Sequence, residues 1–313
     1  MLVAERDGLL IEAAAARRYD GFVCPECGRA LILRRGELKI PHFAHLPPVE
    51  CREARGETEA HHWAKAVLRD AFLKSGTDAE VERRLVGEPA ERRTDLAVAL
   101  PGGGMVAIEI QRSDLTLADI RTRTTSFMRA GVPVVWVGLV DDALALRIGA
   151  GRAGAGLSPE GHFLDRLPLP AWARFAGRLA FGRSAWLDPA AGTLWIGRQE
   201  VSRQFAEPFR RGDPEIGFQD VGGRWRSMKT RVDLRLYGPV PLDALVIRAS
   251  RRRAARIGDV DLPAGPIAWF DTQDGLDGRI ETFTRGYRAA RAAVLGRPAA
   301  AASDRRRTEP RLP

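Results

Sequence analysis

The stretch TDLAVALPGGGMVAIEIQ, residues 94–111, decides the fold. Two largely apolar runs, Thr94–Leu100 and Met105–Gln111, flank the sequence Pro-Gly-Gly-Gly. Pro and Gly at this density mark a turn, so we expect the two runs to pair as an antiparallel β-hairpin. Because side chains alternate along a strand, Glu109 and Gln111 lie on one face of the second strand.

The hairpin also carries a second acid near the first. Asp95 stands at the start of the first strand, and the turn brings it back towards Glu109. Two carboxylates this close repel one another unless a cation neutralises them. An oxygen-rich site with open coordination positions suits Mg²⁺ or Mn²⁺, which activate water and shield phosphate. The pattern predicts a metal centre at Asp95 and Glu109; the alternative is a solvated strand pair with incidental acids.

The segment before the hairpin is expected to be helical. From Glu57 to Lys74, apolar residues recur at three- and four-residue spacing, which is typical of an amphipathic helix. Glu57, His61 and Lys65 are spaced at i, i+4 and i+8, so they share one helix face. We expect that face to point at the same metal. A strand is expected over Val81–Val86, between this helix and the hairpin.

Beyond the hairpin, the pattern predicts a helix over Leu117–Ala130 and a buried central strand over Val132–Val140. Further on, Ala185–Ile196 is typical of a hairpin and Val232–Leu236 of a strand. No catalytic pattern occurs there. A helix is expected after Tyr287, followed by a basic tail.

A compact set of metal-ligand residues precedes the helix. CPEC at residues 24–27 is a CxxC knuckle, HFAH follows at 42–45, and a third cysteine stands at 51. Thiolates and neutral imidazoles suit Zn²⁺, and a unit this small needs a metal to fold. Tetrahedral zinc takes four ligands, and the sequence leaves open which candidate is spare; buried free cysteines are the alternative interpretation. The five candidates are Cys24, Cys27, His42, His45 and Cys51.

Composition limits the class of protein. The 313 residues are 45% hydrophobic and 28% charged, as in ordinary globular proteins, and no apolar run is long enough to span a bilayer. We expect no membrane insertion and, since the start resembles no export signal, a cytoplasmic protein. The net charge of +9 favours a polyanionic partner such as DNA, although the excess of arginine also fits a GC-rich genome.

Taken together, these motifs resemble the competence protein CoiA-like family, which joins an N-terminal Cys/His zinc region to a nuclease domain of the PD-(D/E)XK type. CPEC, HFAH and Cys51 match its zinc region. The nuclease part is matched by Glu57-Thr58 with His61 and Lys65, Arg93-Thr94-Asp95, Ile108–Gln111 with Ser113, Arg123-Thr124 with Phe127, and Val135-Trp136.

The resemblance implies an α/β fold: a PD-(D/E)XK restriction-endonuclease-like core with a small N-terminal zinc-binding module and a C-terminal α+β extension. We place the zinc module at 1–52, the nuclease-like domain at 53–155, the α+β region of unknown role at 156–296 and a disordered basic tail at 297–313.

The resemblance also implies roles for site residues. Asp95 and Glu109 would ligate the catalytic Mg²⁺ or Mn²⁺, and Glu57 would add a carboxylate from the helix. Gln111 takes the place of the usual lysine, just as Thr94 takes that of the usual proline. Glutamine can orient water but adds no positive charge, so Lys65 becomes the candidate for that charge.

Other side chains complete the predicted site. His61 is a candidate phosphate contact or general acid. Arg121 and Arg123 are candidates for binding the nucleic-acid backbone.

Three functions follow from these predictions. The first is a divalent-metal-dependent nuclease acting on DNA, single-stranded DNA included, during DNA uptake and recombination, with recombination proteins as partners. The second is a non-catalytic DNA-binding or recombination accessory protein that retains the nuclease fold. The third is a zinc-stabilised interaction adaptor whose acids are incidental.

Overall fold

The computed structural model describes most of the first 275 residues. The described ranges are 1–18, 21–36, 39–47, 51, 58–85, 92–111, 115–154, 162–164, 169–206, 209–213, 217–222, 226–257, 260–273 and 275. Residues 1–270 form one compact unit and residues 271–313 a second one. The predicted helix after Tyr287 and the predicted tail at 297–313 lie outside the described residues.

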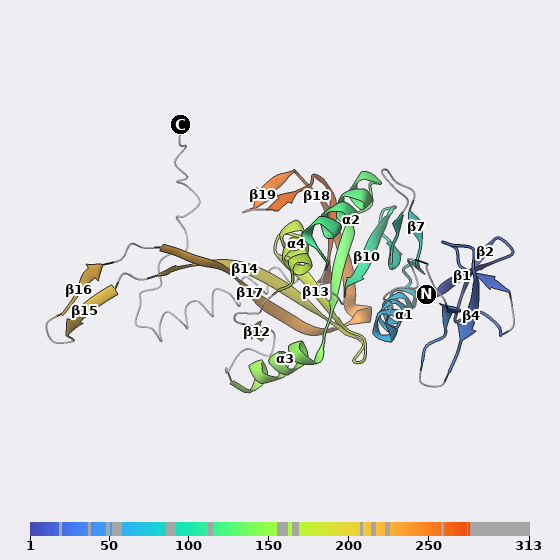
Figure 1. Ribbon diagram of the computed structural model, residues 1–313, viewed down its shortest axis with the longest axis horizontal. Helices are drawn as coiled ribbons and strands as arrows, with labels where there is room; N and C mark the ends of the chain where they lie inside the picture. The colour runs from blue at the N-terminus through green and yellow to red at the C-terminus, as the bar shows by residue number, and fades with distance from the viewer. Residues whose placement is uncertain are drawn as a thin grey trace. The chain divides into compact units, whose positions relative to one another are not determined.

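The N-terminal part of the unit is a small antiparallel sheet (Figure 1). Its spatial order is β2-β1-β3-β4-β5. Phe22, Leu31 and Phe43 fill its interior, beside Cys24 and Cys51. Because this hydrophobic core is small, we expect the module to need a further source of stability, such as a bound metal ion. The strands are β1 (Val3–Arg6), β2 (Leu9–Glu12), β3 (Phe22–Val23), β4 (Ala30–Arg34) and β5 (His42–His45).

The main body is an eight-stranded mixed sheet in the order β12-β17-β14-β13-β11-β10-β9-β6. The pairs β10–β11 and β11–β13 are parallel, and the other neighbours in the sheet are antiparallel. The strands are β6 (Ala79–Val81), β9 (Leu96–Ala99), β10 (Met105–Gln111), β11 (Val134–Leu139), β12 (His162–Leu164), β13 (Arg183–Asp188), β14 (Thr193–Ala206) and β17 (Arg226–Pro241).

The predicted hairpin is confirmed. Strands β9 and β10 pair antiparallel, with Val98 opposite Val106 and Leu96 opposite Ile108. All three glycines of the turn, Gly102 to Gly104, have φ between 82° and 99°, a region in which a side chain would be strained. The turn therefore requires the glycines that signalled it in the sequence.

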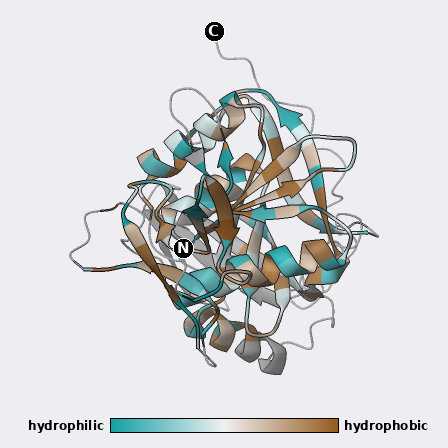
Figure 2. Ribbon diagram, turned by 90° about the vertical axis from the view of Figure 1, so that its right-hand side faces the viewer, coloured by the Kyte–Doolittle hydropathy of each residue, from teal (hydrophilic) through white to brown (hydrophobic). Residues whose placement is uncertain are grey.

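Helices cover both faces of the sheet. Ala107 of β10 belongs to a core that includes Phe127 of α2 and Phe175 of α4. The alternate residues Val106 and Ile108 are buried on the opposite side, where α1 packs on β6, β9 and β10. Figure 2 shows hydrophobic residues gathered on the central strands. The helices are α1 (Glu59–Lys74), α2 (Leu117–Arg129), α3 (Asp142–Gly154), α4 (Ala171–Leu179) and the 3₁₀-helix η2 (Leu242–Ala244).

Helix and strand predictions from the sequence are largely confirmed. Helix α1 begins after Thr58, whose side chain accepts a hydrogen bond from the His61 N–H, and ends at Lys74 as expected. Helix α2 and strand β11 lie where they were expected. The hairpin of β13 and β14 and the strand near Val232 are also present.

The prediction of one continuous strand over Val81–Val86 is wrong. Strand β6 ends at Val81, and β7 (Arg84–Leu85) pairs with β8 (Arg92–Arg93) in a separate two-stranded sheet. Glu82 between them has φ 56°, a left-handed conformation that ends the strand and turns its side chain inward. The polar contacts of Glu82, described below, account for the break.

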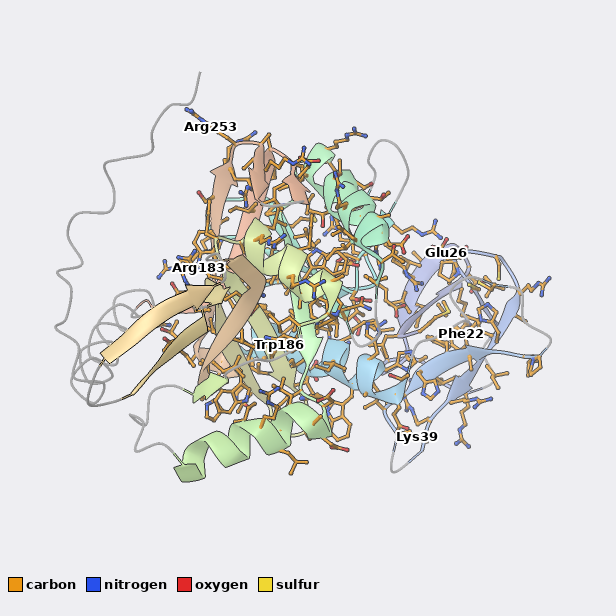
Figure 3. The ribbon with its side chains drawn as sticks, turned by 60° about the vertical axis from the view of Figure 1, so that its left-hand side comes forward. Phe22, Glu26, Lys39, Arg183, Trp186 and Arg253 are labelled. Carbon is orange, nitrogen blue, oxygen red and sulfur yellow. The ribbon has the colours of Figure 1, made fainter. Side chains whose placement is uncertain are left out.

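The main sheet continues across residue 155, since β13 pairs with β11. The predicted nuclease-like domain, which ends at residue 155, thus shares this sheet with the region after it. The domain boundaries given in the sequence analysis stay a prediction. Figure 3 labels one residue of each sheet, Trp186 on β13 of the large sheet and Phe22 on β3 of the small one. The remaining strands form two-stranded sheets: β15 (Phe209–Asp213) with β16 (Gly217–Gly222), β18 (Leu245–Arg252) with β21 (Gly265–Thr272), and β19 (Ala255–Ile257) with β20 (Val260–Leu262).

Candidate metal centres

Four metal-ligand side chains meet in the N-terminal module. Their ligand atoms all lie within 4.8 Å of one another. We call this group the Cys/His cluster, and its members are Cys24, Cys27, His45 and Cys51. Three sulfurs and one imidazole at this spacing can hold a metal such as zinc.

Local structure brings the ligands of the cluster together. The Gly28 N–H donates to the Cys24 carbonyl at 2.8 Å and the Cys24 N–H to the Arg29 carbonyl at 2.8 Å, which closes the CxxC turn between β3 and β4. Strand β5 contributes His45. The Cys27 Sγ then lies 3.3 Å from His45 Nε2, and the Cys24 Sγ 3.9 Å from the Cys51 Sγ. The cysteines form no disulfide.

The protonation of the cluster fits metal binding. Burial raises the pKa of the Cys24 thiol to about 11, so without a cation this group stays protonated. Burial also lowers the pKa of His45, which keeps the imidazole neutral as a ligand requires. A divalent cation would convert the thiols to thiolates and release protons.

His42, the fifth candidate, lies outside the cluster. Its Nδ1 is 3.0 Å from the Ile40 carbonyl, and its ring stacks on that of His62 in α1 at 5.3 Å. Side chains alternate along β5, so His42 and His45 point to opposite faces of the strand. The geometry thus selects four of the five candidates.

Asp95 sits between α1 and the β9–β10 hairpin. Its Oδ2 accepts a hydrogen bond from the Ile110 N–H at 2.8 Å and lies 3.1 Å from His61 Nε2. Its Oδ1 lies 4.0 Å from Lys65 Nζ. The predicted helix residues His61 and Lys65 therefore do meet Asp95, as their spacing indicated.

Glu109 is buried on β10, with 1% of its surface exposed. Its Oε2 forms an ion pair with Arg123 of α2, whose Nη2 lies 2.6 Å away. Burial raises the pKa of Glu109 to about 7, against the lowering effect of Arg123; the nearby Asp95 carboxylate raises it further.

The residues of this acidic centre, Asp95 and Glu109, fit a hard cation. Two carboxylates that repel one another, one of them fully buried, are stabilised by a nearby cation. Oxygen ligands are those that Mg²⁺ and Mn²⁺ prefer. The centre provides two carboxylates from the described residues; Glu57, the predicted third, lies outside them.

Lys65 is the most buried charge of the region. Its side chain is 0% exposed, and its Nζ lies 2.6 Å from Glu82 Oε1. Sequence reasoning missed Glu82, because nothing in the pattern distinguishes it from a solvated strand residue.

The other predicted residues are placed as follows. Gln111 is buried on β10, opposite Gly138 of β11, on the face that also carries Glu109. Arg123 contacts Glu109 and lies over the Trp136 ring at 5.7 Å. Arg121 lies 3.8 Å from Asp261. Both arginines thus lie near a carboxylate of the protein. Their contact with nucleic acid stays a prediction.

The mixed sheet, with helices on both faces and acids on its central strands, is compatible with a nuclease-like domain, and the module before it has a Cys/His cluster that could hold a metal. Comparison with known families gives the same result. Residues 10–54 match "Competence protein CoiA, N-terminal domain", and residues 57–142 match "Competence protein CoiA, nuclease-like domain". These two matches support the assignment of residues 10–142 to the CoiA-like family.

One curated relative is similar over a short segment. The Druantia protein DruB of Escherichia coli (strain UMEA 4076-1) is 50% identical over 40 residues. The match covers 13% of this chain and 7% of that protein. The chain thus spans only a small part of this relative's length. Among the described helices, none is long and apolar enough to cross a membrane.

Proposed function

We propose that the chain is a divalent-metal-dependent DNA nuclease of the PD-(D/E)XK type that acts in the cytoplasm during DNA uptake and recombination, together with recombination proteins. The observation that carries this proposal is the fully buried Glu109 carboxylate on β10, close enough to Asp95 for the two acids to repel one another. Zn²⁺ in the Cys/His cluster is proposed as a structural ion.

The proposed mechanism gives each side chain one task. Asp95 and Glu109 would hold Mg²⁺ or Mn²⁺, which supplies an activated water and shields the phosphate charge. Gln111, on the same strand face as Glu109, orients the attacking water by hydrogen bonding. His61 is close enough to Asp95 to serve as a phosphate contact or to protonate the leaving oxygen.

The module carries a surface suited to the DNA backbone. A hollow of about 700 Å³ is lined by four basic residues and by Leu33, Gly36 and His42. The Arg35 guanidinium donates to the carbonyls of Ala13, Ala14 and Ala16, which fixes its position. Fixed cations in a hollow attract phosphates. We call this the basic hollow, defined by Arg18, Arg34, Arg35 and Lys39.

A second function is favoured by a different observation. Each acid of the centre already has a cation beside it: Arg123 at Glu109, and Lys65 near Asp95. A site balanced by its own side chains needs no metal for charge compensation. With Gln111 in place of lysine, this arrangement supports a non-catalytic DNA-binding accessory protein.

Cleavage of labelled DNA separates the two functions. Purified protein is incubated with single- and double-stranded DNA and Mg²⁺ or Mn²⁺, beside Asp95→Ala and Glu109→Gln. Glu80→Gln serves as a control, because Glu80 is an exposed acid of β6. If the protein is a nuclease, cleavage should require the metal, and its rate should fall about a hundredfold or more in Asp95→Ala and Glu109→Gln but not in Glu80→Gln. DNA binding without cleavage, unchanged in every variant, would establish the accessory role.

A further inference from the structure

Glu82 is a buried carboxylate with several polar partners, unlike the side chain of a solvent-exposed strand residue. Its side chain is 2% exposed. Oε1 accepts from Lys65 Nζ at 2.6 Å and from the Leu2 N–H at 2.9 Å, and Oε2 accepts from the Val3 N–H at 3.2 Å. Arg93 lies 3.8 Å from Oε2. One carboxylate thus joins strand β1, helix α1 and strand β8.

The backbone of Glu82 also supports the acidic centre. Its N–H donates to the Asp95 carbonyl at 3.0 Å, and the Thr94 N–H donates to the Arg83 carbonyl at 3.0 Å. The left-handed φ of 56° is unfavourable for a residue with a side chain. Such a conformation persists where the surrounding contacts fix it, as the hydrogen bonds of Glu82 do here.

The distances around Lys65 indicate what Glu82 does there. Lys65 Nζ is 2.6 Å from Glu82 but 4.0 Å from Asp95. Without Glu82, the buried ammonium would have Asp95 as its nearest carboxylate among these contacts. A lysine bound directly to Asp95 would occupy the oxygen that a metal needs, since both are cations competing for one anion.

We propose that Glu82 is a positioning residue of the acidic centre: it holds Lys65 away from Asp95, and the N–H groups of Leu2 and Val3 in turn hold Glu82. The proposal rests on the metal centre proposed above. It makes strand β1 of the zinc-binding module part of the support for the metal site in the neighbouring domain.

A double-mutant cycle on Mn²⁺ affinity tests whether Glu82 holds Lys65 away from Asp95. Affinity of the zinc-loaded full chain is measured by calorimetry for wild type, Glu82→Gln, Lys65→Met and the double variant. Glu82→Gln is expected to bind about tenfold more weakly, as when a residue supporting a metal ligand is lost. The double variant should recover to within about threefold of wild type, because the competing ammonium is gone. Glu80→Gln should bind as wild type does.

The outcomes distinguish this proposal from the proposed function. Equal Mn²⁺ binding by wild type and by Asp95→Ala/Glu109→Gln would refute the metal centre itself. A normal Mn²⁺ affinity in Glu82→Gln, with the centre still binding metal, would refute only the positioning role. A loss in Glu82→Gln that removing Lys65 fails to repair would show a merely structural residue. Thermal unfolding of each variant establishes that it is folded.

Lysine labelling tests whether strand β1 supports Glu82 and Lys65, and it requires no measurement of enzyme activity. The chain has four lysines, Lys39, Lys65, Lys74 and Lys229. In the zinc-loaded protein, acylation followed by peptide mass mapping should modify the exposed Lys39 and Lys74 and spare the buried Lys65. Removing zinc should release β1 and expose Lys65, and adding zinc back should protect it again. Continued protection of Lys65 in zinc-free protein would overturn the link to β1.

Discussion

The Cys/His cluster and the acidic centre are both candidate metal sites, but they are held together differently. In the cluster, four ligands converge from short strands and a turn around a small core. In the acidic centre, hydrogen bonds and ion pairs within the protein fix the acids, for example Ile110 N–H to Asp95 and Arg123 to Glu109. We therefore expect the first site to need its ion for folding, and we propose that the second needs one only for chemistry.

The largest effect is expected from removing one cluster ligand. His45→Ala should lose the zinc and melt the N-terminal module, because binding free energy at a structural zinc site is folding free energy. His42→Ala is the matched control: its ring stacks on His62 but lies outside the cluster, so it should keep the metal. Metal content per chain and the midpoint of thermal unfolding measure both. If His42→Ala lost the zinc and His45→Ala kept it, the assignment of ligands would be reversed.

A smaller and opposite effect on stability is expected at the acidic centre. Because burial raises the folded-state pKa of Glu109 to about 7, its charged form is less stable folded than unfolded. The favourable contribution is present below about pH 4.5 and is lost as the pH rises through 7. Glu109→Gln should therefore stabilise the metal-free protein by on the order of 1–3 kcal/mol at pH 8, and less at pH 5.

The measurement for Glu109→Gln is chemical unfolding at the two pH values in the absence of divalent ions other than zinc. The same variant should bind Mn²⁺ poorly, so stability and function move in opposite directions. A variant less stable than wild type at pH 8 would show that the Arg123 ion pair outweighs the burial of the acid.

Metal affinity at the acidic centre should itself depend on pH. Protons and Mn²⁺ compete for Glu109, so the affinity should rise by up to about tenfold per pH unit below 7 and level off above it. Titration of Mn²⁺ by calorimetry between pH 5.5 and 8.5 gives the profile. In Asp95→Ala the slope due to Glu109 should persist although binding is weak; a flat profile in wild type would place the metal elsewhere.

The two sites also differ in how far the sequence predicted them. The ligand types and spacing of CPEC and HFAH indicated the cluster, and the Pro-Gly turn between apolar runs indicated the β9–β10 hairpin that carries Glu109. Both signals are local. The choice of His45 over His42 depends on which face of β5 packs towards Cys24, and that is set by tertiary contacts.

Glu82 shows the limit of local patterns. Its partners are 17 residues away at Lys65 and 80 residues away at Leu2, so no periodicity connects them. The strand pattern over Val81–Val86 was misleading because a left-handed residue is recognisable in sequence only when it is Gly or Asn. The helix register, by contrast, correctly placed His61 and Lys65 beside Asp95, since i, i+4 spacing is a property of the helix alone.

The smallest effect is expected at the basic hollow, where contacts are exposed and individually weak. Lys39→Gln and Arg34→Gln should each lower DNA affinity a few-fold and reduce the salt dependence by roughly one counterion per lost contact. Arg253→Gln is a suitable control, because this exposed arginine lies on the main body and not on the module (Figure 3). Fluorescence anisotropy with single-stranded DNA at several salt concentrations provides the slopes. Equal losses from all three variants would mean that the net charge of the chain, rather than the hollow, attracts the DNA.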